Sequence, residues 1–346
     1  MKDQFGREIE YLRLSVTDRC NLRCKYCMPE EGVSAIPMPE ILTYEEIVRI
    51  CRIGAELGIK KIRLTGGEPL VRTGVEELVG MIHEIPGIER IMITTNGILL
   101  KEKLDALVAG GLDGVNISLD TLDPKEFKNI TGRDQLDKVL ESIQAALDAG
   151  LKVKVNTVLL PKDFFEETGL PSHSDNRIPE QMKACSAPGN WLSMLPLAEK
   201  LPVDLRFIEL MPIGEGKVYD NLSSLEVMRV MRERYPDLKE DHTVHGSGPA
   251  VYYTIPGFKG SIGLIQAVHG KFCENCNRVR ISATGQVKPC LCYADTVDLR
   301  SILRSGADDE AVKEAFAAAI YAKPMEHCFE NYAMISEDKK MVSIGG

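Results

Sequence analysis

Short apolar, β-branched runs alternate with helical patterns along the first two-thirds of the chain. The runs predict six strands, at Tyr11–Val16, Lys61–Thr65, Ile91–Thr95, Val115–Leu119, Val153–Leu159 and Leu205–Leu210. Apolar positions at helical spacing predict helices between them, at residues 43–57, 74–84, 101–109, 135–149, 190–200 and 223–235. Thr43 followed by Glu46 predicts a capping box, and glycines stand at three expected C-caps, Gly58, Gly110 and Gly150. Six βα units in series predict a parallel sheet with helices outside it.

Polar and glycine-rich residues recur where successive predicted strands end. They occupy the stretches Thr65–Pro69, Thr94–Gly97, Ser118–Asp120 and Glu209–Pro212. In a closed or partly closed barrel, the chemistry gathers at the C-terminal ends of the strands. Each stretch alone would pass as ordinary loop chemistry, but their recurrence at one end predicts a site there.

The alternating pattern breaks twice. Residues 161–189 carry four prolines and show no clean period, so we predict an irregular insertion there and no function for His173 or Cys185 within it. After about residue 236, short strands are expected at 251–255, 261–265, 279–282 and 286–288, and helices at 298–305 and 308–321. These patterns predict two domains, a barrel over residues 1–235 and a smaller α+β domain, with a sheet starting beside a cysteine group, over 236–346.

Composition narrows the functional classes. With 346 residues and 44% hydrophobic content, the chain is typical of a globular protein of more than one domain. No apolar run is long enough to cross a membrane, and the N-terminus lacks the apolar core of a signal peptide, so we expect a cytoplasmic protein without a membrane partner. The net charge of −9 argues against a nucleic-acid partner, although a few local cations can still bind a small anion.

Three cysteines lie within eight residues in the first loop, Cys20, Cys24 and Cys27. Three thiolates can hold three irons of a four-iron cluster and leave the fourth iron open for a ligand. The cations Arg23 and Lys25 between them are expected to lower the thiol pKa values. The alternative is a zinc knuckle that borrows a distant fourth ligand.

A second cysteine group comprises Cys273, Cys276 and Cys290, followed by Cys292. Counted with Cys292, its spacing is typical of a zinc ribbon, and in an extended strand positions 290 and 292 would share a face. Counted without Cys292, it is another three-cysteine site with an open iron. The spacing alone leaves both interpretations open. Arg278 and Arg280, which lie next to this cysteine group, favour a site that takes a phosphate.

Gly66-Gly67-Glu68-Pro69 follows one predicted strand directly. It lacks the third glycine of a dinucleotide-binding loop and the Gly-Lys-Ser/Thr of a Walker A loop. Paired glycines permit a ligand to approach the backbone, whose unsatisfied groups could bind an amino-acid-like head group.

These motifs together resemble a known family. The cysteine spacing, with Tyr26 before the last cysteine, and the Gly-Gly-Glu-Pro stretch resemble the radical S-adenosylmethionine (SAM) superfamily. Over about residues 5–160 and 203–346, the chain is similar to the GTP 3′,8-cyclase family of molybdenum cofactor biosynthesis. The stretches that carry this closer similarity are Arg13–Asn21, Arg63–Pro69, Asn116–Asp120, Arg206–Glu209, Phe272–Arg280 and Gly345-Gly346.

The resemblance implies a fold and a set of site residues. The fold is a partial (βα)6 TIM-type barrel, open on one side, with a smaller C-terminal α+β domain. Two [4Fe-4S] clusters are implied, the first on Cys20, Cys24 and Cys27 and the second on Cys273, Cys276 and Cys290. The residues implied to contact SAM are Tyr26, Gly67, Ser118 and Met211. Those implied to surround GTP are Arg13, Arg63, Thr94, Lys154, Arg278, Val279 and Arg280, and those implied in catalysis are Arg13, Arg278, Arg280 and the C-terminal Gly345 and Gly346.

In the family, an electron from the first cluster cleaves SAM to methionine and a 5′-deoxyadenosyl radical. The radical removes the 3′ hydrogen of GTP, and C3′ then bonds to C8 of guanine. The resemblance also implies an external one-electron donor, a downstream cyclic pyranopterin monophosphate synthase as a partner, and a homodimer as the expected assembly.

The chain departs from the family pattern in two places. Leu160 runs into the irregular insertion where the family continues into a turn and a helix, and Cys292 stands where an aromatic residue is expected.

Two rival functions remain. One is another radical SAM enzyme, such as a peptide-modifying maturase, which usually carries more C-terminal cysteines and lacks the arginine pair. The other is a non-enzymatic zinc protein with two structural sites.

Overall fold

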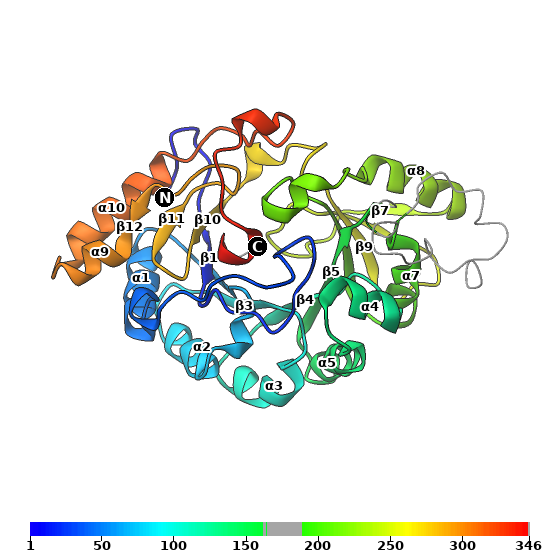
Figure 1. The fold of residues 1–346 in the computed structure, drawn as a ribbon, viewed down its shortest axis with the longest axis horizontal. Helices are drawn as coiled ribbons and strands as arrows, with labels where there is room; N and C mark the ends of the chain where they lie inside the picture. The colour runs from blue at the N-terminus through cyan, green and yellow to red at the C-terminus, as the bar shows by residue number, and fades with distance from the viewer. Residues whose placement is uncertain (162–163, 165–188, 345–346) are drawn as a thin grey trace.

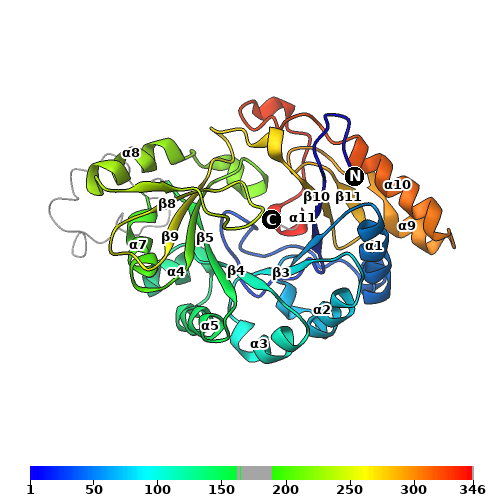
Figure 2. The same ribbon diagram turned by 180° about the vertical axis from the view of Figure 1, so that it is seen from behind.

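One curved, mostly parallel sheet organises the protein, and helices cover its outer face (Figures 1 and 2). The structure is a computed structural model that describes residues 1–161, 164 and 189–344. Within these residues the sheet has the strand order β12-β11-β10-β1-β2-β3-β4-β5-β6-β9-β8-β7, and its two edge strands do not pair with each other. Its central strands are β1 (Tyr11–Ser15), β2 (Lys61–Thr65), β3 (Arg90–Thr95), β4 (Gly114–Ser118), β5 (Lys152–Leu159) and β6 (Asp204–Glu209). The predicted open, partial barrel is confirmed.

The helices of the barrel follow its strands in sequence. They are α1 (Tyr44–Glu56), α2 (Val75–His83), α3 (Leu100–Ala109), α4 (Pro124–Thr131), α5 (Leu136–Asp148), α7 (Trp191–Lys200) and α8 (Ser224–Arg234). All six predicted helices are therefore present. The additional helix α4 carries a signal that the periodicity analysis missed, because Asp123 caps its N-terminus and Pro124 occupies the first turn.

The glycine C-caps differ in one detail from the prediction. Gly58 and Gly150 take left-handed backbone conformations, with φ of 93° and 75°, directly after helices α1 and α5. Gly110 does not, because its φ is −73°. The next residue, Gly111, takes the left-handed conformation instead, with φ of 94°.

The sequence suggested a separate sheet for the C-terminal strands. In the structure these strands join the barrel sheet. Strand β9 (Ser261–Ile265) pairs in parallel with β6, and β8 (Val251–Thr254) and β7 (Lys239–Asp241) continue that edge antiparallel. At the other edge β10 (Arg278–Ile281) pairs in parallel with β1, followed by β11 (Gln286–Lys288) and β12 (Val297–Asp298). Strand β10, which carries Arg278 and Arg280, is thereby hydrogen-bonded to β1, the strand that precedes the first cysteine loop.

The core lies between the sheet and the outer helices, and the inner face of the sheet is polar. On β1, Leu12 and Leu14 are fully buried in the same apolar cluster as Ile47 and Ile50 of α1. Arg13 alternates with these leucines and lines a cavity inside the barrel. Strand alternation therefore separates a hydrophobic outer layer from a polar interior. No helix among the described residues is long and apolar enough to span a membrane.

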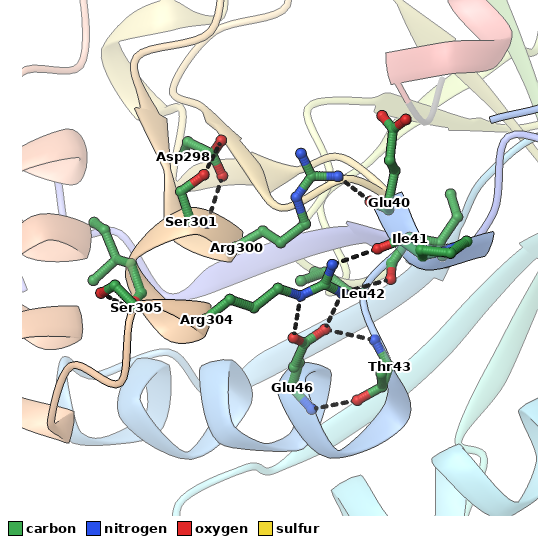
Figure 3. Close-up of polar contacts among 12 residues, drawn as sticks. Glu40, Ile41, Leu42, Thr43, Glu46, Asp298, Arg300, Ser301, Arg304 and Ser305 are labelled. Atoms are coloured by element: carbon green, nitrogen blue, oxygen red, sulfur yellow. Dashed lines mark hydrogen bonds and ion pairs between the residues drawn. The ribbon is translucent and has the colours of Figure 1, made fainter. Parts of the chain in front are cut away.

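Helix α9 (Leu299–Arg304) contacts the start of the first barrel helix (Figure 3), and α10 (Asp309–Tyr321) packs against the same helix. The predicted capping box is confirmed, since the backbone N–H of Glu46 donates to Thr43 Oγ1 at 3.2 Å and Thr43 N–H donates to the Glu46 carboxylate at 2.8 Å. Arg304 then donates to both carboxylate oxygens of Glu46, at 2.7 and 3.0 Å, and to the carbonyl of Ile41 at 3.0 Å. One side chain thus connects the C-terminal segment to the start of α1.

The last described helix, α11 (Met341–Ile344), lies inside the curve of the sheet (Figures 1 and 2). Met341 and Val342 line the interior cavity. Gly345 and Gly346, expected to act in the active site, lie outside the described residues, as do His173, Cys185 and most of the insertion.

Candidate functional site

The first cysteine group lies in the loop after β1, at the C-terminal end of the barrel strands. All three thiols line the interior cavity. Burial raises the pKa of Cys20 to about 11 and that of Cys27 to about 12. The pKa of Cys24 is also raised, by burial and by the neighbouring Cys27. The expected lowering by nearby cations is therefore wrong for these thiols.

The two cations of the loop bind elsewhere, which explains this difference. Arg23 donates from Nη1 to the carbonyls of Cys20 and Leu22, each at 2.8 Å, and Lys25 donates to Asn129 Oδ1 at 2.8 Å. The charge of Arg23 still lowers the pKa of Cys20, but burial outweighs this effect. Three converging, desolvated thiols fit a cationic iron cluster, which would make them thiolates when bound.

Nitrogen donors surround the sulfur of Cys20. Leu22 N–H donates to its Sγ at 3.4 Å, and Asn96 Nδ2 lies 4.0 Å from it. Asn96 also donates to Asn21 Oδ1 at 2.7 Å, which fixes its amide. Hydrogen bonds to ligand sulfurs tune the reduction potential of iron–sulfur clusters. The donor set therefore fits a cluster in this loop.

Gly66 and Gly67 hold the end of β2 against the cysteine loop. A Cβ added to Gly67 would lie 2.4 Å from the carbonyl oxygen of Arg19, and one added to Gly66 would lie 2.6 Å from that of Thr17. The N–H groups of Gly67 and Glu68 donate to these same carbonyls, Thr17 O at 2.9 Å and Arg19 O at 2.8 Å. We expected unsatisfied backbone groups here that could bind a head group. These two N–H groups are instead satisfied within the protein. The glycines admit the cysteine loop itself, and both still line the cavity.

Glu68 connects this loop to the end of β3. Its buried carboxylate accepts hydrogen bonds from Leu70 N–H at 3.0 Å, Thr95 Oγ1 at 2.7 Å and Asn96 N–H at 2.6 Å. Burial raises the pKa of Glu68 to about 7, against the effect of these donors. Glu68 thus positions Asn96 beside Cys20.

The cavity has a volume of about 280 Å³ and brings together side chains from both parts of the chain. All four residues expected to contact SAM line it, namely Tyr26, Gly67, Ser118 and Met211. Tyr26 donates from its hydroxyl to Asp120 Oδ2 at 2.7 Å. Burial raises the pKa of Asp120 to about 6. The arrangement places this polar pair directly beside the first cysteine group.

A row of arginines crosses the floor of the barrel. In the register of β10, β1 and β2, Arg280, Arg13 and Arg63 are direct neighbours, and Arg278 lies two positions before Arg280. Burial and the charge of Arg280 lower the pKa of Arg13 well below its usual range. Burial and the charge of Arg278 lower that of Arg280. The arginines repel one another, and Arg13, Arg278 and Arg280 line the cavity.

Several of these guanidinium groups have an unused donor. Among the described residues, the Nε atoms of Arg206, Arg278 and Arg280 are buried and have no hydrogen-bond acceptor. A buried, unsatisfied donor costs about 1–3 kcal/mol, and more when the group is charged. A polyanion in the cavity would satisfy these donors and relieve the repulsion.

The other residues expected to surround GTP differ in their position relative to the cavity. Thr94 lines the cavity and accepts a 3.4 Å hydrogen bond from Arg63, which also donates to the hydroxyl of Tyr11. Lys154 shares the register of Thr94 through Asn116, so it lies at the same depth of the barrel. Val279 is 1% exposed and packs in the main apolar core, so only its backbone is available to a ligand.

The second cysteine group lies at the start of β10, near the arginine row. Burial would raise the pKa of Cys276, but the charges of Lys323, Arg278 and Arg280 lower it below its ordinary value. Burial raises the pKa of Cys273, whose Sγ accepts from His327 N–H at 3.4 Å. Among the described residues no three His, Cys, Asp or Glu side chains are arranged to hold a single metal ion.

The thiol of Cys292 pairs with that of Cys328, and the extended geometry considered above is not observed. Residues 291 and 292 form a turn, so positions 290 and 292 do not alternate as in a strand. The Sγ of Cys292 lies 2.7 Å from that of Cys328 and accepts from Cys328 N–H at 3.2 Å. Both thiols belong to a small apolar cluster with Leu291 and Phe329.

Two buried cations were missed by the sequence analysis. Arg206 of β6 donates to Asn156 Oδ1 at 2.6 Å and is 6% exposed. A charged residue between the buried Leu205 and Phe207 was the available signal, because alternation places it on the inner face. Lys323 is 3% exposed and donates to the carbonyl of Pro289 at 2.5 Å, and it carried no local signal.

Comparisons with known proteins agree with the arrangement of the site. The model of the radical SAM superfamily matches residues 14–169, and that described as Molybdenum Cofactor Synthesis C matches residues 203–329. A protein of Clostridium perfringens (strain SM101 / Type A) named GTP 3′,8-cyclase is 44% identical over 346 residues, covering all of both chains. One of Syntrophomonas wolfei subsp. wolfei with the same name is 40% identical over 349 residues, again covering both chains completely.

Solved structures show the same fold at low identity. Streptococcus suis SuiB bound to the precursor peptide SuiA has a TM-score of 0.57 and 14% identity, over 97% of this chain and 76% of that one. The SAM-bound structure of SuiB has a TM-score of 0.54 and 12% identity, over 97% and 75% of the two chains. At such identities the likeness concerns the fold alone.

Proposed function

The chain belongs to the GTP 3′,8-cyclase family, within the radical SAM superfamily, and we propose that the barrel cavity is where it binds and cyclises GTP. It is a radical SAM enzyme of molybdenum cofactor biosynthesis with GTP as substrate. Two [4Fe-4S] clusters and SAM are its cofactors. The further assignments concern which residues perform each task.

The observation that carries the assignment of the cavity is its uncompensated positive charge. Arg278 and Arg280 line the cavity and have buried donors without acceptors among the described residues, and Arg13 lies between Arg280 and Arg63 in register. A triphosphate offers many acceptor oxygens and negative charge, and arginine binds phosphate in a bidentate geometry. We assign the triphosphate of GTP to Arg13, Arg63, Thr94, Lys154 and Arg280, with Arg206 added to the expected set.

The first site holds the cluster that SAM binds. Cys20, Cys24 and Cys27 hold three irons, and Tyr26, Gly67, Ser118 and Met211 contact SAM in the cavity. When bound, this cluster and SAM would supply the radical chemistry for the cyclisation of GTP. The protein's own task is to fix GTP so that its ribose faces SAM, which is a positioning effect.

Cys273, Cys276 and Cys290 would hold the other cluster, which would supply a site for the guanine. Arg278 and the backbone of Val279 follow this site directly on β10 and orient the base. Lys323 is assigned to this site because its buried charge favours the thiolate of Cys276. Gly345 and Gly346 are proposed to enter the cavity, since Met341 and Val342 just before them line it.

The remaining assignments follow from the reaction and the chain. Each turnover needs an electron, so an external one-electron donor is proposed, and a cyclic pyranopterin monophosphate synthase consumes the product. Reduced thiols for two clusters suit the cytoplasm. We retain a homodimer as the assembly, and a domain boundary near residue 235, where α8 ends and the chain leaves the βα pattern.

The test is an anaerobic assay with cluster-loaded protein, SAM, a reductant and GTP deuterated at C3′. We expect 5′-deoxyadenosine to form with GTP but not with ATP, and to carry the deuterium. Cys273→Ala should lose about four of about eight irons per chain, whereas Cys51→Ala, which alters a core cysteine of α1, should keep them. Equal 5′-deoxyadenosine with and without GTP would refute the assignment.

A further inference from the structure

Lys154, a proposed triphosphate contact, is already engaged by a carboxylate. It donates to Asp204 of the neighbouring strand β6, its partner in register, and to the hydroxyl of Tyr252 at 3.0 Å. The pKa of Asp204 is lowered although burial opposes this, because the charge of Lys154 favours the carboxylate. A phosphate that approaches Lys154 therefore meets a half-buried negative charge directly beside its ligand.

His245 binds the other side of that carboxylate. Its Nδ1 lies 2.9 Å from Asp204 Oδ1, and its Nε2 lies 3.0 Å from Asp241 Oδ2. Both carboxylates only accept hydrogen bonds, and the hydroxyl of Thr243 also lies 3.2 Å from Nε2, so polar partners hold both ring nitrogens. Its ring stacks on Tyr252 with 3.9 Å between centroids and an angle of 11°.

This geometry gives Asp204 two partners, Lys154 and His245, on different oxygens. Ser261 Oγ also donates to Oδ1 at 2.8 Å, so His245 and Ser261 satisfy one oxygen while Lys154 binds the other. Lys154 can leave without exposing an unpaired carboxylate. The ring stacked on Tyr252 keeps His245 in place while Lys154 moves.

We propose that His245 is a positioning residue that holds Asp204 by a hydrogen bond, so that Lys154 exchanges its carboxylate partner for the triphosphate when the substrate binds. This inference rests on the proposed function, because it takes the triphosphate of GTP as the ligand of Lys154. Without the hydrogen bond from His245, Asp204 retains Lys154 and repels the phosphates. His245 therefore acts on phosphate affinity and leaves the radical chemistry unchanged.

Equilibrium dialysis of anaerobic, cluster-loaded protein tests this with inorganic tripolyphosphate, GTP and guanosine as probes. For His245→Gln we expect affinity for tripolyphosphate and GTP to fall about tenfold, the change typical of one charge-assisted interaction. Affinity for guanosine should not change. In turnover KM for GTP should rise and kcat should stay constant. Matched control His242→Gln, from the same loop but 83% exposed, should behave as wild type.

A double variant separates positioning from folding. Adding Asp204→Asn to His245→Gln removes the uncompensated carboxylate, so affinity for tripolyphosphate should recover relative to the single variant. Wild-type affinity in His245→Gln, or a double variant as weak as the single one, would overturn the proposal. Failure of the proposed function has a separate readout. In that case wild-type protein forms no GTP-dependent 5′-deoxyadenosine, whereas the affinities of the variants for tripolyphosphate can still be compared.

Discussion

Arg280→Met should stabilise the substrate-free protein while weakening GTP binding, which is an unusual pair of effects for a buried residue. Arg280 is 9% exposed, its Nε lacks an acceptor among the described residues, and Arg13 is its neighbour in register. Its guanidinium therefore costs free energy until an anion binds. Methionine keeps most of the apolar stem without the charge.

The magnitude follows from two contributions. Guanidinium groups on adjacent strands about 7 Å apart, at an effective dielectric near 20, repel by about 2 kcal/mol. Leaving the Nε donor unsatisfied costs about 1–3 kcal/mol. Attraction between Arg280 and the sulfurs of Cys276 and Cys290 opposes these contributions. We therefore expect a gain of about 1–3 kcal/mol in the free energy of unfolding, and a roughly ten- to hundredfold loss of GTP affinity.

Urea unfolding of anaerobic, cluster-loaded protein without nucleotide measures the first effect, and equilibrium dialysis with GTP measures the second. Arg72→Met is the matched control, because Arg72 donates to the carbonyls of Val16 and Leu42, each at 2.7 Å. This satisfied arginine should destabilise the protein by about 1–3 kcal/mol when removed. If Arg280→Met destabilises the protein as Arg72→Met does, the reasoning from uncompensated charge is refuted.

Three further predictions concern the scaffold of the site. Gly67→Ala should lose the iron of the first cluster, because its Cβ would lie 2.4 Å from Arg19 O, whereas Gly80→Ala, with nothing within 4 Å, should retain it; equal iron contents would contradict this. Cys292→Ala should leave the iron content unchanged, and a loss of about four irons would identify Cys292 as a ligand. Arg304→Ala should lower the free energy of unfolding by about 1–2 kcal/mol in urea titrations, since it releases Glu46 and a carbonyl; an unchanged value would show that these contacts contribute nothing to stability.

The sequence by itself determined the six barrel strands, six of the barrel helices and the two cysteine groups, whereas α4 was missed. Apolar runs of period two and helical periodicity depend on residues only a few positions apart, so the six barrel strands and their helices could be predicted. The capping box of Thr43 and Glu46 is equally local. The spacing of Cys20, Cys24 and Cys27 also lies within one loop, which is why it predicted cluster chemistry before any fold was known.

Only the tertiary structure decided how distant residues combine. Arg280, Arg13 and Arg63 form a row because β10 pairs with β1 and β1 with β2, a register that local patterns do not specify. Cys292 meets Cys328 because the chain turns at that point. Local spacing cannot report which strands pair or how deeply a group is buried, since both depend on contacts between residues far apart in the sequence. The pKa of the first thiols shows this, because burial by the whole barrel outweighs the neighbouring cations.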